Sequence, residues 1–153
     1  MRKSGGITRG GRGASTKLHP NLTHAQFLRN ELDKTLRPQF GKYTNKETGI
    51  EANLNTRSLK KMSSDKAIEK SKANGFTITD HFEVASKIKD LYIKSKLVET
   101  SPDNKGRRNV LSIKRFRKNI KLSNGRKTVA HITVKETLQN GHTIYSVELL
   151  ELT

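Results

Sequence analysis

Residues Asn109–Leu152 decide the fold, and they read NVLSIKRFRKNIKLSNGRKTVAHITVKETLQNGHTIYSVELLEL. Two Asn-Gly pairs, Asn124-Gly125 and Asn140-Gly141, separate three runs in which apolar and polar residues alternate. An Asn-Gly pair between alternating runs is the strongest short-range signal for a β-hairpin, because both residues readily adopt the positive φ angles of a tight turn. The stretch therefore predicts consecutive antiparallel strands joined by tight turns.

The second hairpin follows from the middle run, Thr128–Glu136. Alternate side chains of a strand point to opposite faces, which gives one face with Ala130, Ile132 and Val134 and another with Val129, His131, Thr133 and Lys135. A two-residue turn at Asn140-Gly141 then pairs Lys135 with Ser146, Val134 with Val147, Thr133 with Glu148 and Ile132 with Leu149. In this register apolar residues lie opposite apolar residues and polar residues lie opposite polar residues, which supports the register.

The first hairpin needs a longer turn. A two-residue loop would pair Arg115 with Val134 and Arg117 with Ile132, and so place charge on the buried face. A three-residue loop with Gly125 in the left-handed conformation instead pairs Phe116 with Ile132, Arg115 with Thr133 and Arg117 with His131. One polar face then collects Arg115, Arg117, His131, Thr133, Lys135, Ser146 and Glu148. Such a face is either the solvated side of an antiparallel sheet or an anion-binding site.

Composition points to a polyanionic partner. Lys and Arg number 31 against 14 acidic residues, which gives a formal net charge of +17. An imbalance of this size favours nucleic acid, since each neutralised phosphate releases condensed counterions. The chain has no cysteine, so disulfides, thiolate chemistry and Cys-containing zinc sites are excluded.

No apolar run approaches the length of a membrane span, and the N-terminus lacks the apolar core of a secretion signal. We therefore expect no membrane association. The expected location is the cytoplasm, with delivery into a target cell or carriage by a phage as further possibilities.

Two parts are expected along the chain, a basic arm over residues 1–49 and a domain over residues 50–153. The Gly- and Arg-rich segment Met1–Lys17 is predicted to be disordered, because it has too few apolar residues to offset its ordering entropy. A capping box at Thr23 begins an amphipathic helix, Thr23–Leu36, that Pro38 ends. The polar residues 38–49 then form a loop at the boundary.

Helices are expected between this loop and the sheet. Glu51–Asn55 is a candidate strand, and Thr56 or Asn55 then caps a brief helical turn through Leu59 and Met62. A polar helix runs from Asp65 to Asn74. A second capping box opens the helix Asp80–Leu97. Its His81 is expected to point toward the sheet, with a pKa that the helix N-terminus lowers toward neutrality, as acid-base catalysis requires.

The helix with Asp80-His81 at its start, the run Lys114-Arg115-Phe116, and the segments ITVKE (132–136) and IYSVELLE (144–151) together resemble a known family. This family comprises the barnase–EndoU–colicin–RelE nuclease-like domains of phage and mobile-element polyproteins and of polymorphic toxins. The resemblance covers residues 50–152 and implies an α+β fold, with helices packed on one face of a C-terminal antiparallel sheet. It also implies a metal-independent ribonuclease in which His81 transfers protons and Arg115, Lys135 and Ser146 line the phosphate site.

We therefore expect an RNA-binding, metal-independent endoribonuclease, of the toxin or phage-effector kind. His81 and either His131 or Glu148 would transfer the two protons, and Arg115, Arg117 and Lys135 would stabilise the phosphate. RNA would also meet Arg107, Arg108, Lys114, Arg117, Lys118 and Arg126. No cofactor or metal is expected, because no Asp and Glu cluster has metal-ligand spacing, and an acidic inhibitor or immunity protein is a possible partner. The alternative is a non-catalytic nucleic-acid-binding protein of a phage or ribosome.

Overall fold

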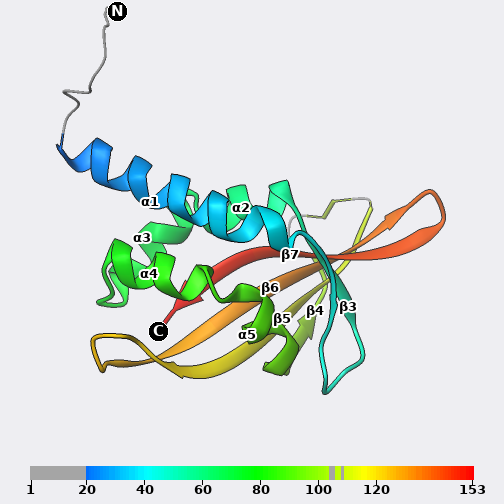
Figure 1. The fold of residues 1–153 in the computed structure, drawn as a ribbon. Coiled ribbons are helices and arrows are strands. Elements are labelled where there is room, and N and C mark those ends of the chain that lie inside the picture. The colour runs from blue at the N-terminus through cyan, green and yellow to red at the C-terminus, as the bar shows by residue number, and fades with distance from the viewer. Residues whose placement is uncertain (1–19, 104–105, 108) are drawn as a thin grey trace, which may run out of the picture. The chain divides into compact units, whose positions relative to one another are not determined.

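The computed structural model describes residues 20–103, 106–107 and 109–153. The predicted disorder of Met1–Lys17 therefore lies outside the described residues. Within the described residues, helices precede a set of long strands, which is an α+β arrangement (Figure 1). The elements are α1 (Pro20–Leu36), η1 (Arg37–Gln39), β2 (Gly41–Thr44), β3 (Glu51–Leu54), α2 (Thr56–Met62), α3 (Asp65–Ala73), α4 (Ile78–Ala85), α5 (Ile88–Lys94), β4 (Lys96–Ser101), β5 (Val110–Lys121), β6 (Lys127–Gln139) and β7 (His142–Leu152).

The chain divides into two compact units, Met1–Asn30 and Glu31–Thr153. The described part of the first unit, residues 20–30, is helical throughout and belongs to α1. The second unit contains the end of α1 and every later element. Residues 41–44, which were expected in a loop, form β2 and pair with β3, so this prediction was wrong.

Six strands form one sheet in the order β2-β3-β7-β6-β5-β4. Every neighbouring pair is antiparallel except β3 and β7, which run parallel through Ala52 opposite Tyr145 and Asn53 opposite Ser146. Antiparallel neighbours can be joined by a tight turn, whereas a parallel pair needs a long connection. Here the connection from β3 to β7 comprises helices α2–α5 and strands β4–β6.

The first hairpin has the predicted register. Phe116 lies opposite Ile132, Arg115 opposite Thr133 and Arg117 opposite His131. Gly125 has a φ of 90°, so it adopts the left-handed conformation that the turn requires. The rejection of a register that buries arginine was correct because Phe116 and Ile132 are both fully enclosed.

The second hairpin follows the prediction only as far as Val134 opposite Val147. A β-bulge then leaves Glu148 without a direct partner, so that Thr133 lies opposite Leu149 and Ile132 opposite Leu150. A bulge inserts one extra residue into a strand and re-aims the side chains beside it. The shift brings Leu150, which is fully buried, into the core against the helices.

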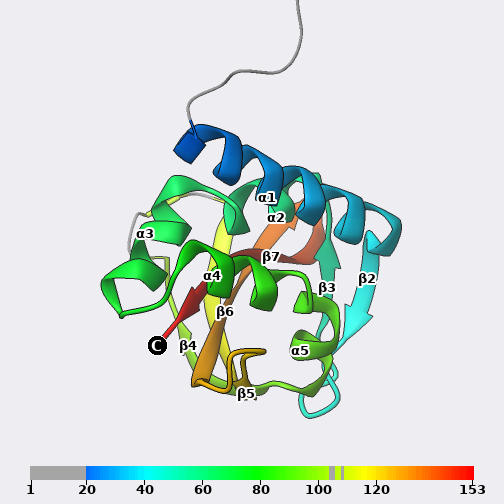
Figure 2. The same cartoon turned by 60° about the vertical axis from the view of Figure 1, so that its left-hand side comes forward.

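Helices α2–α5 cover one face of the sheet (Figures 1 and 2). The Tyr92 ring of α5 packs edge-on against Phe116 of β5, with ring centroids 5.1 Å apart. The buried core also contains Met62, Val84 and Ile88 from the helices and Ala130, Ile132, Val134, Leu150 and Leu152 from the sheet. No helix of the described residues covers the opposite face of β5 and β6, whose polar residues alternate with these core residues.

The expected long helix Asp80–Leu97 was wrong. Thr77 caps α4 through a capping box with Asp80, and α4 ends at Ala85 before α5 begins at Ile88. The Nδ2 group of buried Asn45 donates hydrogen bonds to the carbonyls of Tyr92 (2.7 Å) and Ser95 (2.8 Å), which satisfies polar groups at the end of α5. The chain then enters β4, which pairs with β5.

Candidate functional site

The helix-free face of the sheet carries a row of cations. Arg115, Arg117 and Lys121 project from alternate positions of β5, and all three are exposed. They lie opposite Thr133, His131 and Lys127 of β6. We call this surface the open face; apart from the bulge at Glu148, it has the composition that the sequence predicts.

A cleft of about 210 Å³ opens at the end of this face that lies near the β6–β7 turn. Lys135, Ser146 and Glu148 line it from the two central strands, and Arg57 and Arg107 line it from outside the sheet. Lys135 and Ser146 are directly opposite each other on β6 and β7. The cleft therefore gathers two of the residues expected at the phosphate site, while Arg115 lies one pair further along the open face.

Glu148 is the centre of the cleft's charge network. Its Oε1 atom lies 3.2 Å from Lys135 Nζ, and its Oε2 atom accepts a hydrogen bond of 3.2 Å from Arg57 Nε. The Lys135 and Glu148 side chains are each only 9% exposed. Removing two charges from water costs about as much as their attraction returns. A gain in stability therefore does not explain why Lys135 and Glu148 are buried together. Their position in a cleft favours a functional role.

Local structure explains why Arg57 reaches Glu148. Asn55 caps α2, and its side chain and that of Ser58 form a reciprocal capping box. This cap fixes the first turn of α2 directly after β3, the strand that pairs with Tyr145 and Ser146 of β7. Arg57 consequently lies beside the stretch of β7 that contains the bulge. Sequence reasoning missed Arg57, since no local pattern links it to a residue 91 positions later.

Arg107 adds a third cation to the cleft. It forms two side-chain hydrogen bonds of 2.9 Å to Asp103. These bonds raise the pKa of Arg107, and the nearby Glu148 carboxylate acts in the same direction. Its expected neighbour Arg108 lies outside the described residues.

His81 is on the other side of the sheet, enclosed by helices. Its side chain is completely buried, with Nδ1 2.8 Å from Ser71 Oγ and Nε2 2.7 Å from the Met62 carbonyl. The carbonyl can only accept, so Nε2 carries the proton and Nδ1 accepts from the serine hydroxyl. The pKa of His81 is lowered by burial. We expected the helix N-terminus to be the cause. In this fold His81 has no surface with which to contact RNA.

His131 is on the open face but not in the cleft. Its Nε2 lies 2.7 Å from Thr153 Oγ1. Partial burial is the main cause that lowers its pKa; the Arg117 and Arg115 cations lower it further, and Glu151 opposes them. His131 and Lys135 are four positions apart on one strand, about 13 Å, so the two do not act on the same atoms.

Three of the expected RNA-binding cations do not belong to the open face. Lys114 and Lys118 pair with Val134 and Ala130, so they project on the helix side, and Lys114 lies 3.8 Å from Glu136. Arg126 donates a hydrogen bond of 2.9 Å to the Gly75 carbonyl and lies over the Phe76 ring at 4.4 Å. Its interactions tie the β5–β6 turn to the helices.

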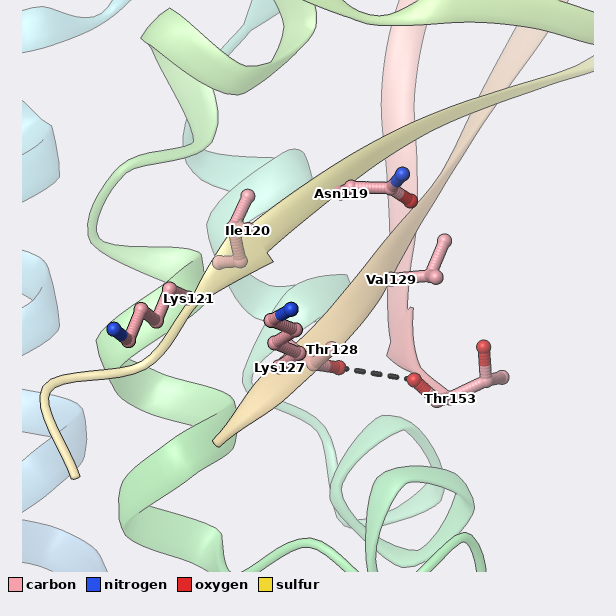
Figure 3. Close-up of a pocket in the computed structure, with 7 residues that line it drawn as sticks. All are labelled: Asn119, Ile120, Lys121, Lys127, Thr128, Val129 and Thr153. Atoms are coloured by element: carbon pink, nitrogen blue, oxygen red, sulfur yellow. Dashed lines mark hydrogen bonds between the residues drawn. The ribbon is translucent and has the colours of Figure 1, made fainter. Parts of the chain in front are cut away.

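A second hollow, of about 570 Å³, lies at the far end of the hairpin formed by β5 and β6 (Figure 3). It is shallow, and its lining consists of Asn119, Ile120, Lys121, Lys127, Thr128, Val129 and Thr153. Asn119 is directly opposite Val129, and Lys121 is opposite Lys127. No titratable group other than the two lysines lines it among the side chains of the described residues.

Neither a metal site nor a membrane-spanning helix is found among the described residues. No three His, Cys, Asp or Glu side chains come close enough together there to hold a metal ion. In the same part of the chain, every helix is too short or too polar to cross a membrane.

Comparison with known proteins identifies the family of the chain. The model of the large polyvalent protein-associated domain 3 family matches residues 23–145, from α1 to the first residues of β7. This range includes Arg57 and Lys135 and ends before Ser146 and Glu148. No curated protein and no solved structure matches the chain. Because the match covers most of its length, the chain belongs to the large polyvalent protein-associated domain 3 family, which is linked to the polyvalent proteins of phages and mobile elements.

Proposed function

We propose that this domain binds single-stranded RNA on its open face and cleaves it in the cleft without a metal ion. The observation that carries the proposal is the pairing of Glu148 with Lys135 and Arg57, with Arg107 lining the same cleft. One carboxylate among three cations offers a proton acceptor together with the positive charge that a reacting phosphate needs. Glu148 takes the catalytic role that was expected of His81.

The reaction follows from this arrangement. Glu148 accepts the proton of an RNA 2′-hydroxyl, and the 2′-oxygen forms a bond to phosphorus as the bond from phosphorus to the 5′-oxygen breaks. The Lys135 ammonium donates a proton to the departing 5′-oxygen. Lys135 then regains a proton from Glu148, which lies 3.2 Å away. The products are a 2′,3′-cyclic phosphate and a 5′-hydroxyl, and both side chains return to their starting states.

The remaining cations have supporting roles. Arg57 and Arg107 stabilise the extra negative charge of the pentacovalent phosphate, since fixed donors in a partly enclosed site need no reorganisation during the reaction. Arg57 is 60% exposed, so its guanidinium has room to turn from Glu148 to a phosphate. Arg115, Arg117 and Lys121 attract the RNA backbone along the open face, on the side of the cleft that leads away from the β6–β7 turn.

Three features support RNA as the substrate. The chain has a net charge of +17, and exposed cations line one face of the sheet. A metal-free reaction of this kind needs the 2′-hydroxyl as its nucleophile, which DNA lacks. The sequence also resembles nuclease-like domains over residues 50–152.

A second candidate function is non-catalytic binding of nucleic acid by the same face. Both carboxylate oxygens of Glu148 already have cationic partners. Among the described residues that line the cleft, moreover, there is one carboxylate and no imidazole. A purely structural protein would use the cleft to hold a phosphate and would leave the chain intact.

One experiment separates the two functions. Purified protein is incubated with RNA in excess EDTA, and wild type is compared with Glu148→Gln. The control is Glu69→Gln, which makes the same change at an exposed position of α3. We expect wild type and the control to yield cyclic phosphate ends, and Glu148→Gln to bind RNA but cleave about 100- to 10,000-fold more slowly. RNA bound but left intact by wild type would support the second candidate. Equal cleavage by Glu148→Gln would reject the assignment of Glu148.

A further inference from the structure

The hollow in Figure 3 lies on the same face as the catalytic cleft, although the two are at opposite ends of the sheet. Residues two positions apart on a strand share a face. Asn119 and Val129 therefore share the open face with Arg117 and His131, with Arg115 and Thr133, and with Ile113 and Lys135. Three such steps separate the hollow from Lys135, a distance of about 20 Å.

The surface between the two sites suits a phosphate backbone. Arg115 and Arg117 occupy the two intermediate steps, and both are exposed. Arg115 has Glu99 as its partner at 3.7 Å, but both side chains are more than half exposed. Exposed ion pairs of this kind are worth little, so a phosphate can replace Glu99. Glu151 lies opposite His131, and its carboxylate accepts a hydrogen bond of 3.1 Å from Asn74.

The hollow itself offers a different chemistry from the cleft. The Asn119 amide is exposed and makes no hydrogen bond to the described residues, so both its donor and its acceptor are available. Val129 provides an apolar surface beside it, while its backbone N–H and C=O groups are both bonded to Thr153. Lys121 and Lys127 flank the opening toward the turn. An amide beside an apolar surface, with cations at the rim, suits a nucleobase whose phosphates lie outside.

We infer that the hollow lined by Asn119, Val129, Lys121 and Lys127 is a subsite for a nucleobase that lies a few nucleotides from the cleaved bond. This inference rests on the proposed function, since the cleft defines where the RNA reacts. The Asn119 amide binds the edge of the base, Val129 contacts its face, and the two lysines hold the adjoining phosphates. RNA must then be long enough to span both sites for full affinity.

The test measures binding and cleavage separately. Fluorescently labelled octanucleotide and dinucleotide RNAs, with 2′-O-methyl groups to block cleavage, are titrated into wild type, Asn119→Ala and Lys121→Ala/Lys127→Ala. The control Lys60→Ala/Lys66→Ala removes two exposed lysines of α2 and α3. We expect the two open-face variants to bind the octanucleotide about five- to tenfold more weakly and the dinucleotide unchanged. Placing one abasic nucleotide at each position of the octanucleotide in turn should reproduce the loss of Asn119→Ala at one position only.

The outcomes distinguish the inference from the proposed reaction. Octanucleotide affinities equal to that of the control would overturn the subsite, whether or not the protein cleaves RNA. Failure of wild type to cleave unmodified RNA would reject the reaction, while the binding series would still decide the subsite. If cleavage occurs, the variants should raise KM for the octanucleotide and leave kcat unchanged. A fall in kcat with constant KM would contradict a binding role.

Discussion

Two buried polar clusters on opposite sides of the sheet differ in their chemistry. On the helix side, His81 is neutral and both its ring nitrogens have partners, Ser71 Oγ and the Met62 carbonyl. Ser71 Oγ also accepts a hydrogen bond of 3.1 Å from the Leu152 N–H, so the cluster joins α3, α4 and β7. On the open face, Glu148 and Lys135 are charged and line a cleft.

This difference shows why burial of a titratable residue does not by itself identify a reactive site. The hydrogen bonds of His81 are complete within the protein, and a substrate would have to break them. The Glu148 cluster opens to solvent, and its Arg57 side chain is 60% exposed, so this cation can turn from Glu148 toward an incoming anion. The first cluster therefore stabilises the fold, and we assign chemistry to the second.

The largest expected effect is on cleavage in the open-face cluster. Lys135→Met keeps most of the side-chain volume but removes the proton donor and a positive charge. We expect RNA cleavage to fall by about two to four orders of magnitude, measured as a single-turnover rate at saturating protein. Lys118→Met is the control, since Lys118 projects on the helix side. Cleavage by Lys135→Met at the wild-type rate would remove the basis for assigning chemistry to this cluster.

The next effect concerns stability. His81→Ala leaves a cavity and removes the partner of Ser71 Oγ, so we expect the free energy of unfolding to fall by about 2–4 kcal/mol. Urea denaturation measures this loss, and His131→Ala should lose less than about 1 kcal/mol because His131 is on the open face. Cleavage per folded molecule should be unchanged for His81→Ala. If His81→Ala is as stable as wild type but no longer cleaves RNA, His81 is a catalytic residue and the helix-side cluster is the reactive one.

A pH series sharpens the contrast further. The pKa of His81 is lower in the folded protein than its ordinary value of 6.5 because of burial. The unfolded chain then binds more protons below pH 6.5, so stability is fully present above this pH and falls as the pH decreases toward the folded-state pKa. Urea midpoints measured from pH 7.5 to 5 should decline more steeply for wild type than for His81→Ala. Parallel curves would show that His81 does not couple protonation to folding.

The smallest expected effect separates the two faces along a single strand. Arg117 and Lys118 are neighbours on β5, but only Arg117 lies on the open face. Arg117→Ala should weaken RNA binding and reduce the slope of log affinity against log salt by about 0.7, the value for one phosphate on a single strand. Lys118→Ala should keep the wild-type slope. Equal changes in the two variants would mean that RNA is bound by diffuse charge rather than by one face.

The sequence by itself determined the α+β class, the first hairpin and the composition of the open face. These features depend on local patterns: side chains alternate along a strand, and Asn-Gly pairs fix the turns. Burying Arg115 would have been costly, so the register with Phe116 opposite Ile132 was predictable. Lys135 and Ser146 were placed opposite each other by the two-residue turn at Asn140-Gly141.

Only the tertiary structure decided the bulge at Glu148, the position of Arg57 and the enclosure of His81. The bulge depends on which leucine of β7 fits against the helices, and Leu150 rather than Leu149 lies opposite Ile132. Arg57 reaches Glu148 because β3 adds to the edge of β7, a pairing between residues far apart in the sequence. His81 is enclosed because α3 and the end of α2 pack around α4. Packing between distant segments sets burial and side-chain direction, and no local pattern contains that information.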